Sequence, residues 1–515
     1  MLYKTYQSTV LLVSYSGEPS YYAHYIPDLS LAYISAAAKN MGYGSKSIDL
    51  NHLDFTQNNV LDYVVQYKPL FVGMKLIGNG MPELVKLAKK IKKVEPKSII
   101  VAGGPQVTTF RDTIYSYTNI FDFLIYGEGE KATMELISFL EGKLPISKVR
   151  NLIYKNANNI ITNPMILERN LDSLPYPNWQ VHDLNKYFPV FMVNMVRGCQ
   201  YQCAFCSHNY FWGRETTDKD LTGKTIHEIR TKNIIRKRSW QNIQGEINEN
   251  IAYFGVSLFE IVDSTPDIEL LRKFAKYLNN AEFSVNWVGF GRVAYYDEKF
   301  LKDLSLSGCI ALWYGIESGN EEILRKMGKS FKIEEVKKTI VSTKENGIKT
   351  ICAFIVGFPG ETSDSLSDTL RLMEELKPDT TILIPFFLQR GSPIAYSPHL
   401  YNVKVYDDWI SRALKPWSEK EQHQIDYYSV SNTPNSVWWE QFKEQSKYTD
   451  WVGKRDLSET EIAELLSHLL GIDRDNFVYR VNDAIKRNDK QELLDLINQA
   501  WEISKQRSKF IPHQN

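Results

Sequence analysis

The chain of 515 residues is 43% hydrophobic and 24% charged, which is the composition of a globular protein with room for two to four domains. Its 61 lysines and arginines balance 61 aspartates and glutamates, so the formal net charge is zero. No overall field attracts a polyanion, and we expect no nucleic acid as a partner.

Over the first 140 residues, short apolar runs alternate with helical patterns. Runs of this length suit buried strands, and the alternation predicts an α/β domain with a doubly wound, Rossmann-like parallel sheet. The predicted strands are Thr9 to Ser14, Ser45 to Leu50, Leu70 to Lys75, Ser98 to Ala102 and Phe121 to Tyr126, and the predicted helices are Leu29 to Asn40, Met81 to Val94 and Lys131 to Glu141.

Glycines gather where these strands are predicted to end, at the edge of such a sheet that binds ligands. Each glycine alone also suits a tight strand-to-helix turn. As a set, the stretches Pro27 to Tyr33, Gly103 to Pro105 and Tyr126 to Glu130 resemble the cobalamin-binding domain that often precedes a radical S-adenosylmethionine domain, over about residues 8–143. The resemblance implies a cobalamin contacted by Tyr15, Gly78, Gly103, Gly104, Gly127, Glu128 and Gly129.

The first loop departs from one pattern of cobalamin proteins. Ser14-Tyr15-Ser16-Gly17-Glu18-Pro19 contains no histidine of the Asp-x-His-x-x-Gly type, which ligates cobalt from below in many of them. Radical enzymes with this domain frequently lack that histidine too, so the sequence is compatible with cobalamin that has no histidine ligand.

A proline-bearing stretch separates the two halves of the chain. Each proline in Leu171 to Pro177 forbids helix and biases the preceding residue to extended geometry, so we expect an irregular linker. The expected organisation is a cobalamin-binding-like domain over residues 1–143, a linker over 144–187, a barrel over 188–396 and a mostly helical C-terminal domain over 397–515.

Three of the five cysteines lie in one short loop, Cys199-Gln-Tyr-Gln-Cys203-Ala-Phe205-Cys206, after an apolar run. Three thiolates on one loop can hold an inorganic centre. A closed zinc site takes four protein ligands, whereas an iron–sulfur cluster held by three leaves one iron open. Zinc stays a rival, because His208 follows closely enough to complete a Cys3His site.

This spacing, with an aromatic residue before the last cysteine, resembles the signature loop of radical S-adenosylmethionine (radical SAM) enzymes. The resemblance implies a [4Fe-4S] cluster on Cys199, Cys203 and Cys206 whose open iron binds S-adenosylmethionine. In that family, reductive cleavage of this cofactor gives a 5'-deoxyadenosyl radical. It also implies a small-protein electron donor such as flavodoxin or ferredoxin.

Strands and helices alternate again after the linker, as expected for the partial (β/α)6 barrel of this family. The predicted strands are Val190 to Val196, Tyr253 to Val262, Val285 to Gly289, Ile310 to Ile316, Thr350 to Val356 and Thr381 to Phe386.

Several residues at the ends of these strands match cofactor-binding positions of the family. Glu317 suits the ribose hydroxyls or an ammonium group. Arg292 suits a carboxylate, with a surface or ion-pair role as the alternative. Gly357 lets main-chain groups approach an adenine, and Phe205 packs near it. Asp263 is expected to contact substrate or cofactor, with helix capping as the alternative.

The C-terminal region carries no strand pattern. Glu459 to Leu470 and Asn476 to Lys505 read as amphipathic helices, preceded by an aromatic-rich stretch from Tyr427 to Trp451. Such density usually marks a core, although members of the family use this region to select substrate.

The leading functional hypothesis is a cobalamin-dependent radical SAM methyltransferase acting on an unactivated carbon of a peptide or natural product. An epimerase or rearranging enzyme without methyl transfer is the first alternative, in which Cys352, or Cys309, donates a hydrogen atom; burial for packing is the simpler role for both. A non-catalytic zinc protein is the remote alternative.

The ends and the cysteines of the chain bear on its compartment. Met1 to Ser8 lacks a secretory pattern, no apolar run approaches the length of a bilayer span, and five cysteines make no disulfide framework. We therefore expect a cytoplasmic protein without a membrane partner.

Overall fold

The fold is that of a computed structural model of the whole chain. It describes residues 9–17, 21–208, 215–219, 225–229, 235–405, 428–430, 433–434, 444 and 460–509. The chain forms two compact units. Among the described residues, the first contains those up to Phe188 together with Val481–Ile497, and the second contains the remainder.

The first unit is built on a seven-stranded sheet with the order β2-β1-β3-β4-β5-β6-β7. Its first five strands are parallel, in the doubly wound order 2-1-3-4-5. Apolar runs form these strands because both faces of the sheet are covered, and the five central residues of β1 are buried. The parallel strands are β1 (Thr9–Tyr15), β2 (Gly44–Asp49), β3 (Val72–Leu76), β4 (Ile100–Gly103) and β5 (Phe123–Ile125).

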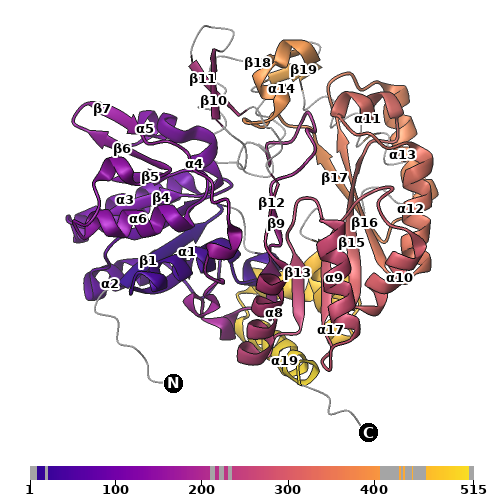
Figure 1. Cartoon of the computed structure of the whole chain (residues 1–515), viewed down its shortest axis with the longest axis horizontal. Coiled ribbons are helices and arrows are strands. Elements are labelled where there is room, and N and C mark those ends of the chain that lie inside the picture. Colours follow the sequence, from indigo (N-terminus) through magenta and orange to yellow (C-terminus); the bar gives the residue numbers. More distant parts are fainter. Residues whose placement is uncertain are drawn as a thin grey trace. The chain divides into compact units, whose positions relative to one another are not determined.

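Helices on both faces connect these strands (Figure 1). Two of them, α1 (Leu29–Asn40) and α3 (Met81–Val94), have the predicted bounds, and α6 (Glu130–Leu140) is shifted by one residue. The Asp28 carboxylate caps α1 by accepting from the backbone N–H of Leu31 at 3.0 Å. The remaining helices of this unit's sheet are α2 (Gln57–Tyr67), α4 (Pro105–Phe110) and α5 (Ile114–Tyr117).

The stretch expected to be an irregular linker contains two strands. β6 (Leu152–Asn156) pairs antiparallel with β5, and β7 (Asn159–Thr162) completes a hairpin at the edge of the same sheet (Figure 1). Leu152 and Ile153 are fully buried. The prolines that suggested a linker lie outside this hairpin, whose strands are too short to give a clear period-two pattern.

The second unit contains a six-stranded parallel sheet in the order β17-β16-β15-β14-β13-β8. The expected partial barrel of six strands is confirmed. Its strands are β8 (Val190–Val193), β13 (Leu258–Ile261), β14 (Asn286–Gly291), β15 (Cys309–Glu317), β16 (Lys349–Val356) and β17 (Thr380–Pro385).

Helices connect consecutive barrel strands on the outside of the sheet (Figure 1). They are α8 (Trp240–Phe254), α9 (Ile268–Asn279), α10 (Glu298–Leu306), α11 (Glu321–Met327), α12 (Ile333–Glu345) and α13 (Ser363–Leu376). The predicted strand at Tyr253 to Val262 began too early, because its first residues end α8 and pass through Gly255 in a left-handed conformation.

Short elements complete the second unit. β9 (Val196–Arg197) pairs with β12 (Arg236–Lys237), and two further small sheets are formed by β10 (Glu215–Lys219) with β11 (Thr225–Ile229) and by β18 (Val403–Val405), β19 (Tyr428–Val430) and β20 (Thr433–Pro434). A single-turn helix, α14 (Pro393–Tyr396), follows the barrel. Most of the aromatic-rich stretch before residue 460 lies outside the described residues.

The C-terminal region is helical, as expected, with α17 (Thr460–Leu470), α18 (Arg474–Arg487) and α19 (Lys490–Arg507). The helix predicted over Asn476 to Lys505 is two helices, because the chain turns at Asn488 with a φ of 54°. α17 packs on β14 and β15, and its Glu464 forms an ion pair with Lys349, so it belongs to the barrel unit.

Within the described part of the chain, no helix has the length and apolar character needed to span a bilayer.

Substitution of Asn151 tests whether the segment after residue 143 is part of the first sheet. It is fully buried, has a φ of 57°, and its side chain bonds to the backbone of Glu128 and Ile166. Asn151→Ala should lower the free energy of unfolding by about 2–4 kcal/mol, because it leaves buried groups without partners and places alanine in the left-handed region. Scanning calorimetry measures this change, with Asn159→Ala at the exposed hairpin tip as the control. Equal effects of the two substitutions would contradict the assignment.

Candidate functional site

A cavity of about 410 Å³ opens at the carboxyl ends of strands β14 to β17. Alternate residues of a strand face the same side, so Trp313, Gly315 and Glu317 of β15 reach it together. The cysteine loop, His208, Arg292 and Lys329 also line it. Its aromatic lining consists of Tyr201, Phe205, Phe290, Trp313, Phe331, Phe386 and Phe387.

The three clustered cysteines all line this cavity. Their loop is held from within by a hydrogen bond from the Cys206 N–H to the Cys203 carbonyl at 3.0 Å. It is held from outside by a bond from the Ala204 N–H to the Met327 carbonyl at 2.9 Å, at the end of α11. Burial raises the pKa of Cys203, and raises that of Cys206 to about 11, so a cationic centre is needed to keep these thiols ionised at neutral pH.

The three thiols line one cavity. Among the described residues, no three His, Cys, Asp or Glu side chains form a group that could hold a single ion, although His208 faces the same space. Zinc draws thiolate sulfurs to about 2.3 Å from one point. The metal content of the reconstituted protein therefore distinguishes a zinc ion from a multi-iron cluster at these thiols.

Glu317 occupies an unusual backbone position at the end of β15. Its φ is 72°, and the register between β15 and β16 shifts between Gly315 and Glu317. This bulge turns the buried carboxylate back over Gly315, where an added Cβ would stand 2.5 Å from Oε1 of Glu317. The glycine in Tyr314-Gly315-Ile316-Glu317 therefore makes room for the carboxylate.

Lys329 is a site residue that the sequence reasoning missed. Its Nζ lies 3.0 Å from Oε1 of Glu317 and donates to the Gly315 carbonyl at 3.0 Å. Burial alone would lower the pKa of Lys329, but the Glu317 carboxylate and the Cys203 thiol raise it. The residue follows the left-handed Gly328 that ends α11, and a lone lysine after a short helix gives no periodic signal.

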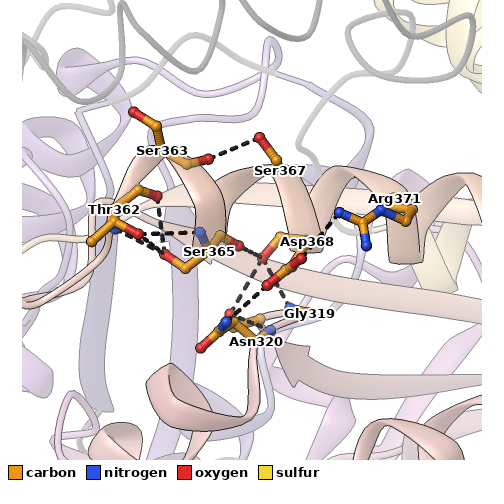
Figure 2. Close-up of polar contacts among 10 residues, drawn as sticks. Gly319, Asn320, Thr362, Ser363, Ser365, Ser367, Asp368 and Arg371 are labelled. Atoms are coloured by element: carbon orange, nitrogen blue, oxygen red, sulfur yellow. Dashed lines mark hydrogen bonds and ion pairs between the residues drawn. The ribbon is translucent and has the colours of Figure 1, made fainter.

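The turn that follows Glu317 is tied to α13. The Gly319 N–H donates to Oγ1 of Thr369 at 2.9 Å, and Nδ2 of Asn320 donates to Oδ2 of Asp368 at 2.8 Å (Figure 2). Thr362 caps the same helix, with its Oγ1 accepting from the Ser365 N–H at 3.2 Å. These bonds fix the end of β15, so the strained conformation of Glu317 is held by its surroundings.

Arg292 and Phe205 were predicted to bind the cofactor, and both line the cavity. The guanidinium of Arg292 lies over the ring of Tyr201, with Cζ 3.2 Å from the ring centre, in a cation–π contact. Phe205 packs edge-to-face on Phe358, the residue after Gly357, with ring centres 6.5 Å apart.

Gly357 is not among the described residues that line the cavity. It has a φ of 79°, and its N–H donates to the carboxylate of Glu361. This internal bond occupies the Gly357 amide, and the approach of other main-chain groups here to an adenine stays a prediction. Burial raises the pKa of Glu361 from 4.5 to about 7.

Cys352 lies on the wrong face of its strand for the hydrogen-donor role. Its neighbours Ala353 and Ile355 line the cavity, whereas neither Cys352 nor Cys309 does so among the described residues. Cys352 is fully buried, which raises the pKa of its thiol far above the ordinary value. Both cysteines are packing residues in this structure.

Asp263 does not reach the cavity either; the neighbouring Ser264 and Thr265 do. The Asp263 carboxylate is buried and accepts hydrogen bonds from residues 194–196, just before the cysteine loop. Burial raises its pKa to about 7 against those bonds. Helix capping is not its role, because Asp267 caps α9.

The glycines of the first unit lie at the carboxyl edge of its sheet, as predicted. Gly103 ends β4, and Gly78 follows β3 with a φ of 56°. Gly104 and Gly127 have φ values of 97° and 68°, and a Cβ there would stand 3.0 Å from the Leu76 carbonyl and 2.7 Å from Met165. A Cβ on Gly129 would meet Ile34. For these last three, the turn itself explains the glycine.

The predicted cofactor contact of Glu128 is not supported. Glu128 is 6% exposed, and its Oε2 accepts from the Glu168 N–H at 2.6 Å. This carboxylate holds the chain that leaves β7 and is a structural residue.

The edge of the first sheet still has polar groups that suit a ligand. Tyr15 ends β1, and the hydroxyl of the preceding Ser14 is buried without a hydrogen-bond partner among the described residues. Asp28 forms an ion pair with Lys75 of β3, and this pair holds the start of α1 to the sheet. Although burial alone would raise the pKa of Asp28, Lys75 keeps it below its ordinary value. An unpaired buried hydroxyl beside glycine turns fits the polar rim of a corrin ring.

Two family models match the chain. The model of the radical SAM superfamily matches residues 193–373, and that of the B12 binding domain matches residues 21–137.

Curated relatives share about a quarter of their residues with the chain. A protein of Pyrococcus horikoshii named as an uncharacterised methyltransferase is 25% identical over 370 residues, which cover 70% of this chain and 76% of that protein. The anaerobic magnesium-protoporphyrin IX monomethyl ester cyclase of Rubrivivax gelatinosus is 25% identical over 371 residues, covering 68% and 63%.

Solved structures share the fold over nearly the whole length. The radical SAM methyltransferase TsrM of Kitasatospora setae, with cobalamin and a [4Fe-4S] cluster bound, aligns with a TM-score of 0.67 at 15% identity, covering 93% of this chain and 99% of that one. The cobalamin-dependent radical enzyme OxsB, with aqua-cobalamin and S-adenosylmethionine bound, aligns with a TM-score of 0.60 at 13% identity, covering 97% and 79%.

Glu361 should make stability depend on pH. Its pKa is raised on folding, so the folded state holds the proton more tightly and stability falls as pH rises from 4.5 to about 7. Glu361→Gln should remove up to about 3 kcal/mol of that loss. The check is the difference in melting temperature between pH 5 and pH 8, which should shrink in this variant and stay unchanged in Glu374→Gln, on the exposed face of α13. An unchanged difference in Glu361→Gln would refute the assignment.

Proposed function

We propose that this chain, which belongs to the radical SAM superfamily and carries a B12-binding domain ahead of its radical domain, methylates an unactivated carbon of a peptide or natural-product substrate. The observation that carries the proposal is the presence of both cofactor domains in one chain, with three thiols lining the barrel cavity. Methyl transfer is the reaction that gives each domain a task.

The cofactors would supply the chemistry that no side chain can provide: the cluster an electron, S-adenosylmethionine a carbon radical and methyl groups, and cobalamin the carrier for a methyl group. The residues of the chain would bind and orient these groups. Cys199, Cys203 and Cys206 would ligate the cluster, and the glycine turns and the Ser14 hydroxyl at the edge of the first sheet would accommodate cobalamin.

The ion pair of Glu317 and Lys329 would bind S-adenosylmethionine. This cofactor carries an ammonium, a carboxylate and ribose hydroxyls, which need acceptors and donors close together. Glu317 presents acceptors and Lys329 presents donors in one buried place beside the cysteine loop. Arg292 is a second cation for the carboxylate, and Phe205 offers a face to the adenine.

The aromatic lining would exclude water from the radical. Phe290 and Trp313 pack with ring centres 5.5 Å apart deeper along the strands than Gly315. A dry, apolar chamber protects a carbon radical from side reactions and gives an organic substrate a surface to contact.

The alternative of epimerisation has less support. It requires a hydrogen donor that reaches the substrate, and the two candidate thiols of Cys309 and Cys352 are buried and are not among the described residues that line the cavity. Reduction of the cluster calls for an external electron donor, for which flavodoxin or ferredoxin is the proposed class.

The first test is anaerobic reconstitution of the full chain with iron and sulfide. We expect about four irons per chain, a brown colour, retention of added cobalamin and formation of 5'-deoxyadenosine from S-adenosylmethionine under reduction. Replacing Cys203 by alanine should abolish the nucleoside product, because three ligands are needed. A colourless protein that takes up one zinc ion would contradict the proposal.

Lys329 offers a sharper test of S-adenosylmethionine binding. Lys329→Met should weaken that binding about 10- to 100-fold, because it removes the buried cation and leaves Glu317 unpaired. Equilibrium binding to the reconstituted protein measures the effect. Lys326→Met, on the exposed side of α11, is the matched control and should bind as the unaltered protein does. Equal affinities of all three proteins would exclude Lys329 from the site.

A further inference from the structure

Three consecutive residues after β13 each contact a different part of the cysteine loop or its approach. The Asp263 carboxylate accepts hydrogen bonds from residues 194–196. Oγ1 of Thr265 lies 3.1 Å from Sγ of Cys199, and Oγ of Ser264 lies 3.0 Å from Nδ1 of His208. They therefore contact the loop before its first thiol, at that thiol and beyond its last one.

Asp263 makes the most constraining of these contacts. A single oxygen, Oδ1, accepts from the Met195 N–H at 2.8 Å, the Val196 N–H at 2.9 Å and Nδ2 of Asn194 at 3.0 Å. Met195 and Val196 are almost fully buried, so without the carboxylate their amides would have no water to bind. Two successive amides pointing at one oxygen fix the direction in which the chain enters the loop.

A buried cation holds the same turn from the other side. The backbone N–H of Arg238 donates to the Met195 carbonyl at 3.0 Å, and Nη1 of its guanidinium donates to the Asn194 carbonyl at 3.0 Å. Nη2 of Arg238 pairs with Oε2 of Glu246 at 2.6 Å, and both side chains are buried. Burying these charges is costly, and replacing them by apolar residues would often stabilise a fold. Their position suggests that they serve to fix this turn.

From this geometry we propose that Asp263 is the positioning residue of the cysteine loop, with Ser264 and Thr265 extending the same template along the loop. The inference rests on the proposed function, because it takes the loop to hold a cluster. It goes further by assigning a segment with no cluster ligand to cluster assembly. Asp263 acts through the backbone of residues 195 and 196 and is not among the described residues that line the cavity.

The test combines hydrogen–deuterium exchange of the full chain with its iron content after anaerobic reconstitution. In Asp263→Ala and Asp263→Asn, the amides of Met195 and Val196 should exchange on the order of tenfold faster or more. Iron bound per chain should fall to less than half. Asn keeps a neutral acceptor, so its effect should be the smaller of the two.

Asp379→Asn is the matched control. Oδ2 of Asp379 also accepts two bonds, from N and Oγ1 of Thr350 at 2.9 Å each, but at the amino end of β16, away from the cysteine loop. This variant should take up iron like the unaltered protein, even if its stability changes.

The outcomes separate the two proposals. If the unaltered chain takes up no iron, the proposed function fails. If it does and both Asp263 variants load as much iron, the positioning role is refuted, whatever their amide exchange. If Asp263→Ala does not fold, Asp263→Asn decides: faster exchange at residues 195 and 196 with reduced iron supports the role, and unchanged iron overturns it.

Discussion

The site depends on one constraint, which is that a single eight-residue loop must hold three thiols around one space. A loop of this kind has few bonds of its own, and here its shape comes from its neighbours. The turn before it is held by the Asp263 carboxylate, its centre by the end of α11 at Met327, and its first thiol lies against Thr265. Since these contacts come from the segments that follow two different strands, β13 and β15, the barrel itself sets the positions of the thiols.

The second feature of the cavity is its pair of opposite charges. Glu317 and Lys329 are both largely buried, and the carboxylate is reached only through a bulge, a left-handed backbone and a glycine two residues earlier. Such an arrangement costs stability, and the bonds of the following turn to α13 hold it in place (Figure 2). This arrangement supports the proposal that the pair binds a zwitterionic cofactor.

Much of this could be predicted from the sequence, because the signals were local. Helical periodicity placed α1 and α3 at their observed bounds, and the cysteine spacing identified the loop. The predictions that failed needed tertiary information. Asp263 follows a strand at the correct edge, yet its side chain turns to the backbone, and Cys352 differs from its cavity-lining neighbour Ala353 only in the parity of its position on β16. Lys329 becomes a site residue only when α11 brings it to Glu317.

The central claim is that an iron of the cluster on Cys199, Cys203 and Cys206 is free to bind S-adenosylmethionine. Electron paramagnetic resonance of the reduced, reconstituted chain tests it most directly, because ligation of that iron changes the spectrum of the cluster. The account predicts a cluster signal whose g-values shift when S-adenosylmethionine is added. A signal that the cofactor leaves unchanged, or a protein that yields no such signal, would contradict it.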